Sequence, residues 1–197
     1  MNCHAVDEQL RTWVSTHQRT PLAHEQLSIA TAQTAAAQQA HSQLAALIGP
    51  NKQRLLLLDT TALMTAAYSA YYFNDASLWD VAFAAQPTPQ LVLLMGLDLP
   101  WQADGLQRDG QAAQLGVDRL LRNALQQRGA AFQVVYGHGA LRTSNAWQAI
   151  QAACAQHQRS SSDRAKVTHT EALNFHAWGC EGCSDPDCER RLFKGLF

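Results

Sequence analysis

The sequence predicts an α/β fold built around a parallel sheet, and three observations support this prediction. First, residues 55–58 and 91–95 are uninterrupted apolar runs, which are typical of strands buried on both faces of a parallel sheet. Second, segments with helical spacing alternate with these runs, as they do in βαβ units. Third, an acid follows each run, Asp59 or Asp98. Ligands of open α/β sheets bind beyond the carboxyl ends of the strands, so these acids are candidates for function.

The order of the elements follows from the apolar spacing and from the turn residues. Thr20 is expected to cap a long Ala- and Gln-rich helix with Pro21 at its first position, and Ser144 is expected to cap the last helix. Trp13 and Trp147 are expected in the core. The expected strands cover residues 2–6, 55–59, 90–96 and 132–136. The expected helices cover residues 8–17, 22–47, 61–73, 78–85, 112–128 and 144–157. A linker is expected over residues 159–163.

The composition excludes several classes of protein. A chain of 197 residues is long enough to bury a core, and its formal net charge of -1 gives no basic surface for nucleic acid or an anionic membrane. The first residues lack the basic start and apolar stretch of a signal peptide. Five cysteines, three of them near the C-terminus, favour a reducing compartment over a secreted disulfide framework. We therefore expect a cytoplasmic protein without a membrane or nucleic-acid partner.

Asp59 has two interpretations from its local context. Its carboxylate could hold a magnesium ion through water or accept a proton from an attacking hydroxyl. Alternatively, Asp59 and Thr60 could simply cap the helix that follows.

Three motifs across residues 2–155 carry a resemblance to a known family. They read Val6-x-Glu8-x-x-Arg11-x-Trp13, then Leu-Leu-Leu-Leu-Asp59-Thr60, then Leu-Val-Leu-Leu-Met-x-x-Asp98-x-Pro100-Trp101-x-x-Asp104-Gly105-x-x-Arg108-Asp109. This array resembles the kinase domain of NadR-type ribosylnicotinamide kinases and the related NadR-like AAA-type P-loop ATPases. The Pro-Trp-x-x-Asp-Gly-x-x-Arg block is its most specific part. The resemblance implies a three-layer P-loop kinase fold, with ATP and magnesium as cofactors and a small molecule as substrate.

The resemblance also implies two catalytic residues. Asp59 would lie after the third strand of the fold, near the magnesium ion and the substrate ribose. Arg108 would lie in a small lid over the phosphates, where a cation offsets the charge that spreads over the transferred group. The alternative for Arg108 is a surface ion pair with Asp109 of little energetic value.

Five further residues would contact the substrate if the resemblance holds. Glu8 and Arg11 would face the substrate from the end of the second strand, and Asp104 would share the lid with Arg108. Trp101 would stack on a nicotinamide ring, because an indole face suits a flat cationic heterocycle. Tyr68 would form part of the pocket wall. The alternative for Trp101 is a packing residue in a loop.

The chain departs from the family in one respect. P-loop kinases need Gly-x-x-x-x-Gly-Lys-Ser/Thr, whose backbone N–H groups cradle the phosphates, and the sequence contains no such run. In the family this run follows the first strand, which lies at the centre of the sheet. Without that strand, the sheet would have a gap flanked by unpaired edges. Either the start codon lies further upstream, which in-frame translation of the upstream DNA would show, or the protein is a degenerate relative.

The C-terminal segment has its own pattern. Cys180, Cys183 and Cys188, with His176 upstream, form a Cys₃His set that suits tetrahedral zinc, although His169 competes for the fourth position. The alternative is a reduced cysteine cluster without metal. The expected division is a truncated kinase-like domain over residues 1–158, then a linker and Cys-rich tail over residues 159–197.

Two functions remain in competition at this stage. The first is an ATP-dependent kinase domain for a ribosylnicotinamide-like molecule, inactive as given because the phosphate loop is missing. The second is a non-catalytic binding or regulatory module with a zinc-binding tail. The sequence does not indicate an oligomeric state.

Overall fold

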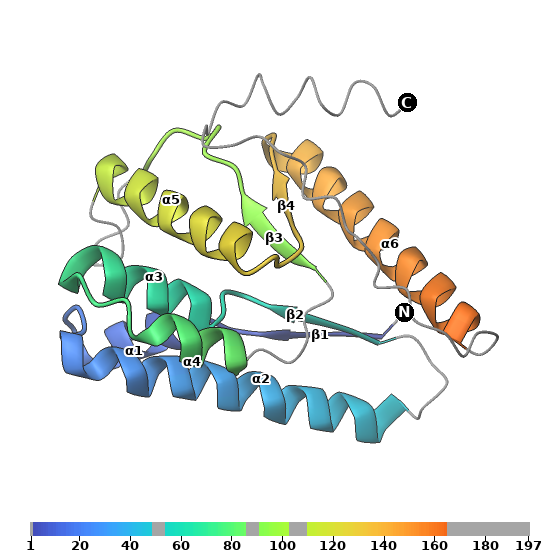
Figure 1. The fold of residues 1–197 in the computed structure, drawn as a ribbon, viewed down its shortest axis with the longest axis horizontal. Coiled ribbons are helices and arrows are strands. Elements are labelled where there is room, and N and C mark those ends of the chain that lie inside the picture. The colour runs from blue at the N-terminus through green and yellow to red at the C-terminus, as the bar shows by residue number, and fades with distance from the viewer. Residues whose placement is uncertain (1, 49–53, 86–90, 103–109, 165–197) are drawn as a thin grey trace. The chain divides into compact units, whose positions relative to one another are not determined.

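The computed structural model describes residues 2–48, 54–85, 91–102 and 110–164 and confirms an α/β fold with parallel strand pairing. These residues divide into two compact units, with most of α5 in the first unit and its last residues in the second. The first unit contains β1 (Asn2–Val6), α1 (Gln9–His17), the 3₁₀ helix η1 (Ala23–Glu25), α2 (Gln26–Ile48), β2 (Arg54–Leu58), α3 (Ala62–Phe73), α4 (Leu78–Ala84) and α5 (Gln111–Gln127) (Figure 1). The second contains β3 (Val92–Met95), β4 (Phe132–Val135) and α6 (Gly139–Arg164).

The core of the first unit forms around α2. This helix packs on both β1 and β2 and also contacts α1 and α3 (Figure 1). Small buried residues, including Ala30, Ala37 and Ala40, let its neighbours approach closely. On α3, Leu63 and Ala66 are buried, so this helix supplies the apolar side chains that complete the core.

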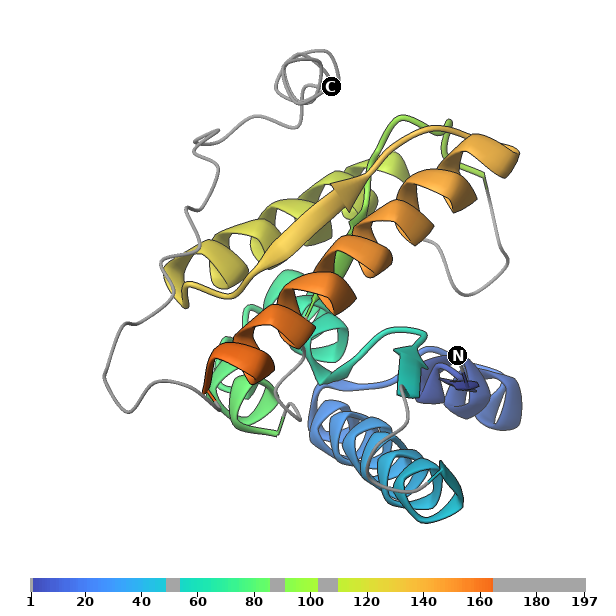
Figure 2. The same cartoon turned by 90° about the vertical axis from the view of Figure 1, so that its right-hand side faces the viewer.

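The second unit is a parallel β3–β4 pair with α6 beside β4 (Figure 2). Leu94 and Val135, one from each strand, are buried. Gly137 and Gly139 both have positive φ, at 98° and 52°, which lets the chain turn directly from β4 into α6.

The strands of the described residues pair as two sheets of two strands each, β1–β2 and β3–β4. The full three-layer P-loop architecture that the resemblance implies stays a prediction. Burial on both faces, expected for the strand over residues 55–58, is wrong: Leu57 is 39% exposed, and Leu55, Leu56 and Leu58 are only half-buried. Side chains alternate along a strand, so Leu57 points to the opposite face from Leu56 and Leu58, and that face is less covered at this position.

Several local predictions were wrong. The long helix is not capped by Thr20 and Pro21; η1 precedes it, and the N–H of Leu22 donates to the Glu25 carboxylate at 2.7 Å. Helix α6 begins at Gly139 and not after Ser144. It also continues through the expected linker over residues 159–163, where no proline or glycine interrupts it.

The two tryptophans expected in the core also differ from the prediction. Trp147 is 42% exposed. Trp13 is half-buried and stacks on His17 with a centroid separation of 3.9 Å, while the Arg19 guanidinium lies 4.8 Å from its ring. Among the described helices, none is long and apolar enough to cross a membrane.

Candidate functional site

The candidate site lies at the carboxyl end of the β1–β2 pair. Val6 pairs in register with Leu58, and the N–H of Asp59 donates to the Val6 carbonyl at 2.9 Å. This bond continues the ladder past the last residue of β2, so the Asp7–Glu8 and Asp59–Thr60 segments leave the sheet together. Parallel sheets bind ligands at such an edge.

Glu8 and Asp59 are close enough for their charges to interact. The pKa of Glu8 is raised above its usual 4.5, first because the side chain is partly buried. The Arg11 guanidinium, whose Nε lies 3.6 Å from Glu8 Oε2, opposes the rise, and the negative charge of Asp59 adds to it. Asp59 itself is exposed. The pair therefore concentrates negative charge beside solvent, where carboxylate oxygens suit a hard divalent cation.

The raised pKa predicts that Glu8→Gln stabilises the chain at neutral pH. In the folded state the Glu8 carboxylate is disfavoured, and this penalty is absent below the unfolded pKa of 4.5 and develops as the pH rises through the folded value. Glu8→Gln removes the penalty at the cost of an Arg11 ion pair of small value. In urea denaturation, we expect Glu8→Gln and wild type to be equally stable near pH 4, and Glu8→Gln to be the more stable at pH 7. A Glu8→Gln variant less stable than wild type at pH 7 would contradict the assignment.

The turn that carries Asp59 is strained. Thr60 has a φ of 63°, which is unusual for a β-branched residue and costs about 1–2 kcal/mol relative to the right-handed region. The next residue, Thr61, is the N-cap of α3, and its side chain accepts the N–H of Leu63 at 3.3 Å. Asp59 and Thr60 are therefore not the cap of this helix, and the Asp59 carboxylate is not used for capping. Such strain is typical of functional turns.

A small pocket lies behind this turn. It has room for roughly one water molecule. Its lining residues are Gln33, Thr34, Ala37, Leu58, Thr61, Ala62 and Ala85. A nucleoside does not fit in this pocket.

The other predicted site residues lie in the first unit, in the second unit or outside the described part of the chain. In the first unit, Arg11 lies beside Glu8, as described above. Tyr68 belongs to the same unit but lies about 10 Å along the α3 axis from the helix start, with its ring 6.2 Å from that of Tyr72. Trp101 is half-buried in the second unit. The residues outside the described part of the chain are Asp104, Arg108, His176, Cys180, Cys183 and Cys188. Among the described residues, no group of three or more His, Cys, Asp and Glu side chains could hold a metal ion.

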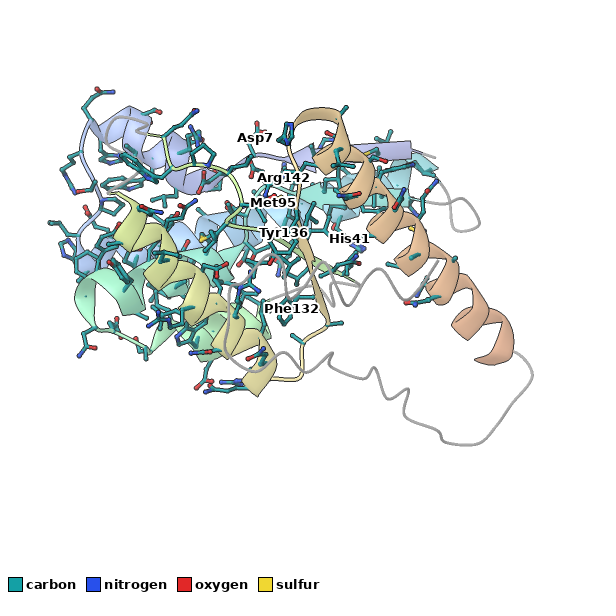
Figure 3. The ribbon with its side chains drawn as sticks, turned by 90° about the horizontal axis from the view of Figure 1, so that it is seen from above. Asp7, His41, Met95, Phe132, Tyr136 and Arg142 are labelled. Carbon is teal, nitrogen blue, oxygen red and sulfur yellow. The ribbon has the colours of Figure 1, made fainter. Side chains whose placement is uncertain are left out.

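A second polar cluster lies at the carboxyl end of the β3–β4 pair. Arg142 Nη2 donates to Asp98 Oδ1 at 2.7 Å and to the Gly96 carbonyl at 2.7 Å, and Asp98 Oδ2 accepts the N–H of Gly137 at 2.6 Å. Figure 3 labels Arg142 together with Met95, the last residue of β3, and Tyr136, which follows β4. The Asp98 and Arg142 side chains are only 8% and 18% exposed. Nearby, Asn145 Nδ2 donates to the Tyr136 carbonyl at 3.1 Å. Through its hydrogen bonds to Gly137 and Arg142, Asp98 therefore links the segment after β3 to the start of α6. The sequence did not indicate this structural role.

Comparison with known families addresses the class of the protein. A family model described as an AAA domain matches residues 1–142. The chain belongs to this AAA domain family. The match runs from β1 into the first turn of α6 and so includes Glu8, Asp59, Asp98 and Arg142. Searches of curated proteins and of solved structures gave no match.

Membership of the AAA domain family implies a P-loop nucleotide-binding module, with ATP and magnesium as ligands. The described residues fit the metal better than the phosphates. Phosphate-transfer sites bind magnesium through one or two carboxylates plus phosphate and water oxygens, and Glu8 and Asp59 supply two such carboxylates. The phosphates need a basic cradle, and the lysines of the chain, Lys52, Lys166 and Lys194, all lie outside the described residues.

Proposed function

We propose that this AAA domain is the kinase domain of an ATP-dependent small-molecule kinase, and that Glu8 and Asp59 form its divalent-cation site. The observation that carries the proposal is that both carboxylates leave the same end of a parallel strand pair, where the N–H of Asp59 bonds the Val6 carbonyl two residues before Glu8. A magnesium ion bound there would offset the negative charge of the phosphates during transfer. The proposed substrate class is a ribosylnicotinamide-like molecule, supported by the resemblance of the Pro100-Trp101 block.

The proposal gives each side chain a role. Asp59, exposed at the end of the turn, contacts the cation. Glu8, whose charge interacts with that of Asp59, contributes the second carboxylate to the cation site. Arg11 limits the rise of the Glu8 pKa and offers a donor to the substrate. From the family resemblance, we propose Arg108 as a second catalytic residue and Trp101, Asp104 and Tyr68 as substrate-binding residues.

We further propose that the 197 residues alone do not transfer phosphate at a useful rate, because they contain no Gly-x-x-x-x-Gly-Lys-Ser/Thr run. This same observation favours a second candidate function, a non-catalytic binding module whose Cys180, Cys183, Cys188 and His176 bind zinc. The zinc content of the purified chain tests the tail, and a cation site without any nucleotide affinity would favour the second candidate.

The test of the cation site is a titration with manganese, monitored by the electron paramagnetic resonance signal of the free ion. We expect Asp59→Asn to weaken manganese binding about tenfold or more, because one of two charged oxygen ligands is lost. The matched control is Asp80→Asn, which makes the same charge change at an exposed position on α4 of the same unit. Equal affinities for wild type, Asp59→Asn and Asp80→Asn would overturn the proposal. ATP hydrolysis by the wild-type chain above that of Asp59→Asn would contradict its inactivity.

A further inference from the structure

The segment that follows β3 is held at two points by groups at the start of α6. The Gly96 carbonyl accepts Arg142 Nη2 at 2.7 Å. Two residues further along the chain, Asp98 Oδ2 accepts the N–H of Gly137 at 2.6 Å, and Asp98 Oδ1 accepts Arg142 Nη2 at 2.7 Å. The Asp98 side chain is only 8% exposed, so water has little access to compete for these bonds. Residues 96–98 are therefore fixed to the turn between β4 and α6.

Only two residues separate Asp98 from Trp101, and the second of them is Pro100. A proline ring fixes its own φ at about −65° and restricts the backbone of the preceding residue, here Leu99. The backbone between Asp98 and Trp101 therefore has few dihedral angles that are free to vary. Leu99 is 39% exposed and Pro100 is also exposed, so packing does not hold these two residues. The anchor that sets the position of Trp101 from this side is Asp98.

The type of anchor favours a role beyond stability. Apolar residues of similar volume often stabilise a protein as well as a buried ion pair does, so stability alone does not account for the Asp98–Arg142 pair. Two charge-assisted bonds to one carboxylate do fix its direction, because each bond has a narrow range of good geometry. A flat ring that stacks on an indole also requires the indole to be held in one place.

We propose that Asp98 is a positioning residue for Trp101: its carboxylate holds the segment after β3 on the start of α6, and Pro100 carries that fixed geometry to the indole. The proposal deepens the proposed function, and it rests on that function only for the ligand, a cationic nicotinamide-like ring stacked on Trp101. The placement of Trp101 is measurable without any ligand. Asp98 and Trp101 belong to the same compact unit.

Asn145 provides a matched control at the same turn. Its Nδ2 donates to the Tyr136 carbonyl at 3.1 Å. Among the hydrogen bonds of the described residues, that of Asn145 reaches Tyr136 and none of residues 96–101. Asp98→Ala and Asn145→Ala therefore each remove side-chain bonding to the turn between β4 and α6. Only Asp98→Ala releases the segment that leads to Trp101.

The experiment is ¹⁹F NMR of the full chain labelled with fluorotryptophan, in which Trp101→Phe identifies the Trp101 signal. We expect Asp98→Ala to move this signal toward that of free fluorotryptophan and to narrow it, because the indole becomes solvated and mobile, and we expect Asn145→Ala to leave it in place. The methylnicotinamide cation is the probe for the ligand. We expect its affinity to fall about fivefold in Asp98→Ala, the loss typical of one cation–π contact, and to stay unchanged in Asn145→Ala.

Three results would overturn the proposal. The first is a folded Asp98→Ala protein in which the Trp101 signal does not move. The second is an equal movement of this signal in Asp98→Ala and Asn145→Ala, which would mean that general loosening of the unit displaces the indole. The third is methylnicotinamide binding of equal affinity in wild type and Asp98→Ala.

Two further outcomes separate this proposal from the proposed function. If methylnicotinamide binds none of the proteins but the Trp101 signal moves only in Asp98→Ala, the proposed substrate class fails and the positioning role stands. If Asp98→Ala does not fold, ¹⁵N relaxation of wild type decides: the backbone order parameter of Trp101 should be about 0.85, as in rigid backbone. A value below about 0.6, which is typical of flexible backbone, would overturn the positioning role.

Discussion

Arg142→Met is expected to lower the free energy of unfolding of the second unit by about 3–5 kcal/mol, because it leaves the Asp98 carboxylate buried without its ion-pair partner. Asp98 is 8% exposed and has few solvent contacts to replace the guanidinium. Arg142 also bonds the Gly96 carbonyl at 2.7 Å and the Val135 carbonyl at 3.2 Å. The Val135 carbonyl still accepts the N–H of Gly96 at 2.8 Å in the variant, so the Gly96 carbonyl is the one that loses its Arg142 donor without this replacement. Urea denaturation followed by tryptophan fluorescence measures the change.

The control for this prediction is the double variant Asp98→Asn with Arg142→Met. Removing both charges leaves no buried ion, so we expect the double variant to be more stable than Arg142→Met alone. Exposed ion pairs typically contribute about 1 kcal/mol or less. If Arg142→Met lowers the free energy of unfolding by less than that, the Asp98–Arg142 pair does not behave as a buried ion pair.

Gly96→Ala is expected to destabilise the same unit by about 1–3 kcal/mol through overpacking. A Cβ atom at Gly96 would overlap the ring of Tyr136. Tyr136 is only 8% exposed, so its ring cannot turn into solvent to relieve the overlap. Thermal or urea denaturation of the variant measures the loss.

Gly116→Ala is the matched control for Gly96→Ala. A Cβ atom at Gly116 would also overlap a tyrosine ring, that of Tyr71, but Tyr71 is 36% exposed and its ring can turn toward solvent. Gly116 lies inside α5, where alanine is favoured over glycine by about 1 kcal/mol. We therefore expect Gly116→Ala to be neutral or stabilising. Equal losses for the two variants would mean that burial of the tyrosine does not decide the cost.

The sequence predicted the parts of the fold that depend on local pattern. The apolar run before Asp59 and the alternation of strands with helices correctly indicated parallel pairing, and they placed Asp59 at the carboxyl end of a strand. Glu8 was associated with Asp59 only through the family resemblance. The register between β1 and β2 brings the two acids to the same end of the sheet. This register pairs residues far apart in the chain, so it cannot be predicted from a short sequence pattern.

The remaining features depend on contacts that are distant in the chain. Gln33 bonds to Gln9, 24 positions away, and within the Ala- and Gln-rich helix nothing in the sequence distinguishes it from the exposed Gln38. Arg142 bonds to Asp98, 44 positions away, and reads in the sequence as an ordinary polar residue of an amphipathic helix. The exposure of Trp147 likewise follows from which face of α6 packs on β4, which its composition does not decide.

The measurement that tests the central claim most directly is manganese binding by Glu8→Gln, Asp59→Asn and the double variant, with Asp80→Asn as the charge control. If Glu8 and Asp59 act on one ion, each single variant weakens binding. The double variant then loses less binding free energy than the sum of the two single losses, because the residues share one ligand. Affinities that match Asp80→Asn in every variant would contradict a cation site at the carboxyl end of β1 and β2.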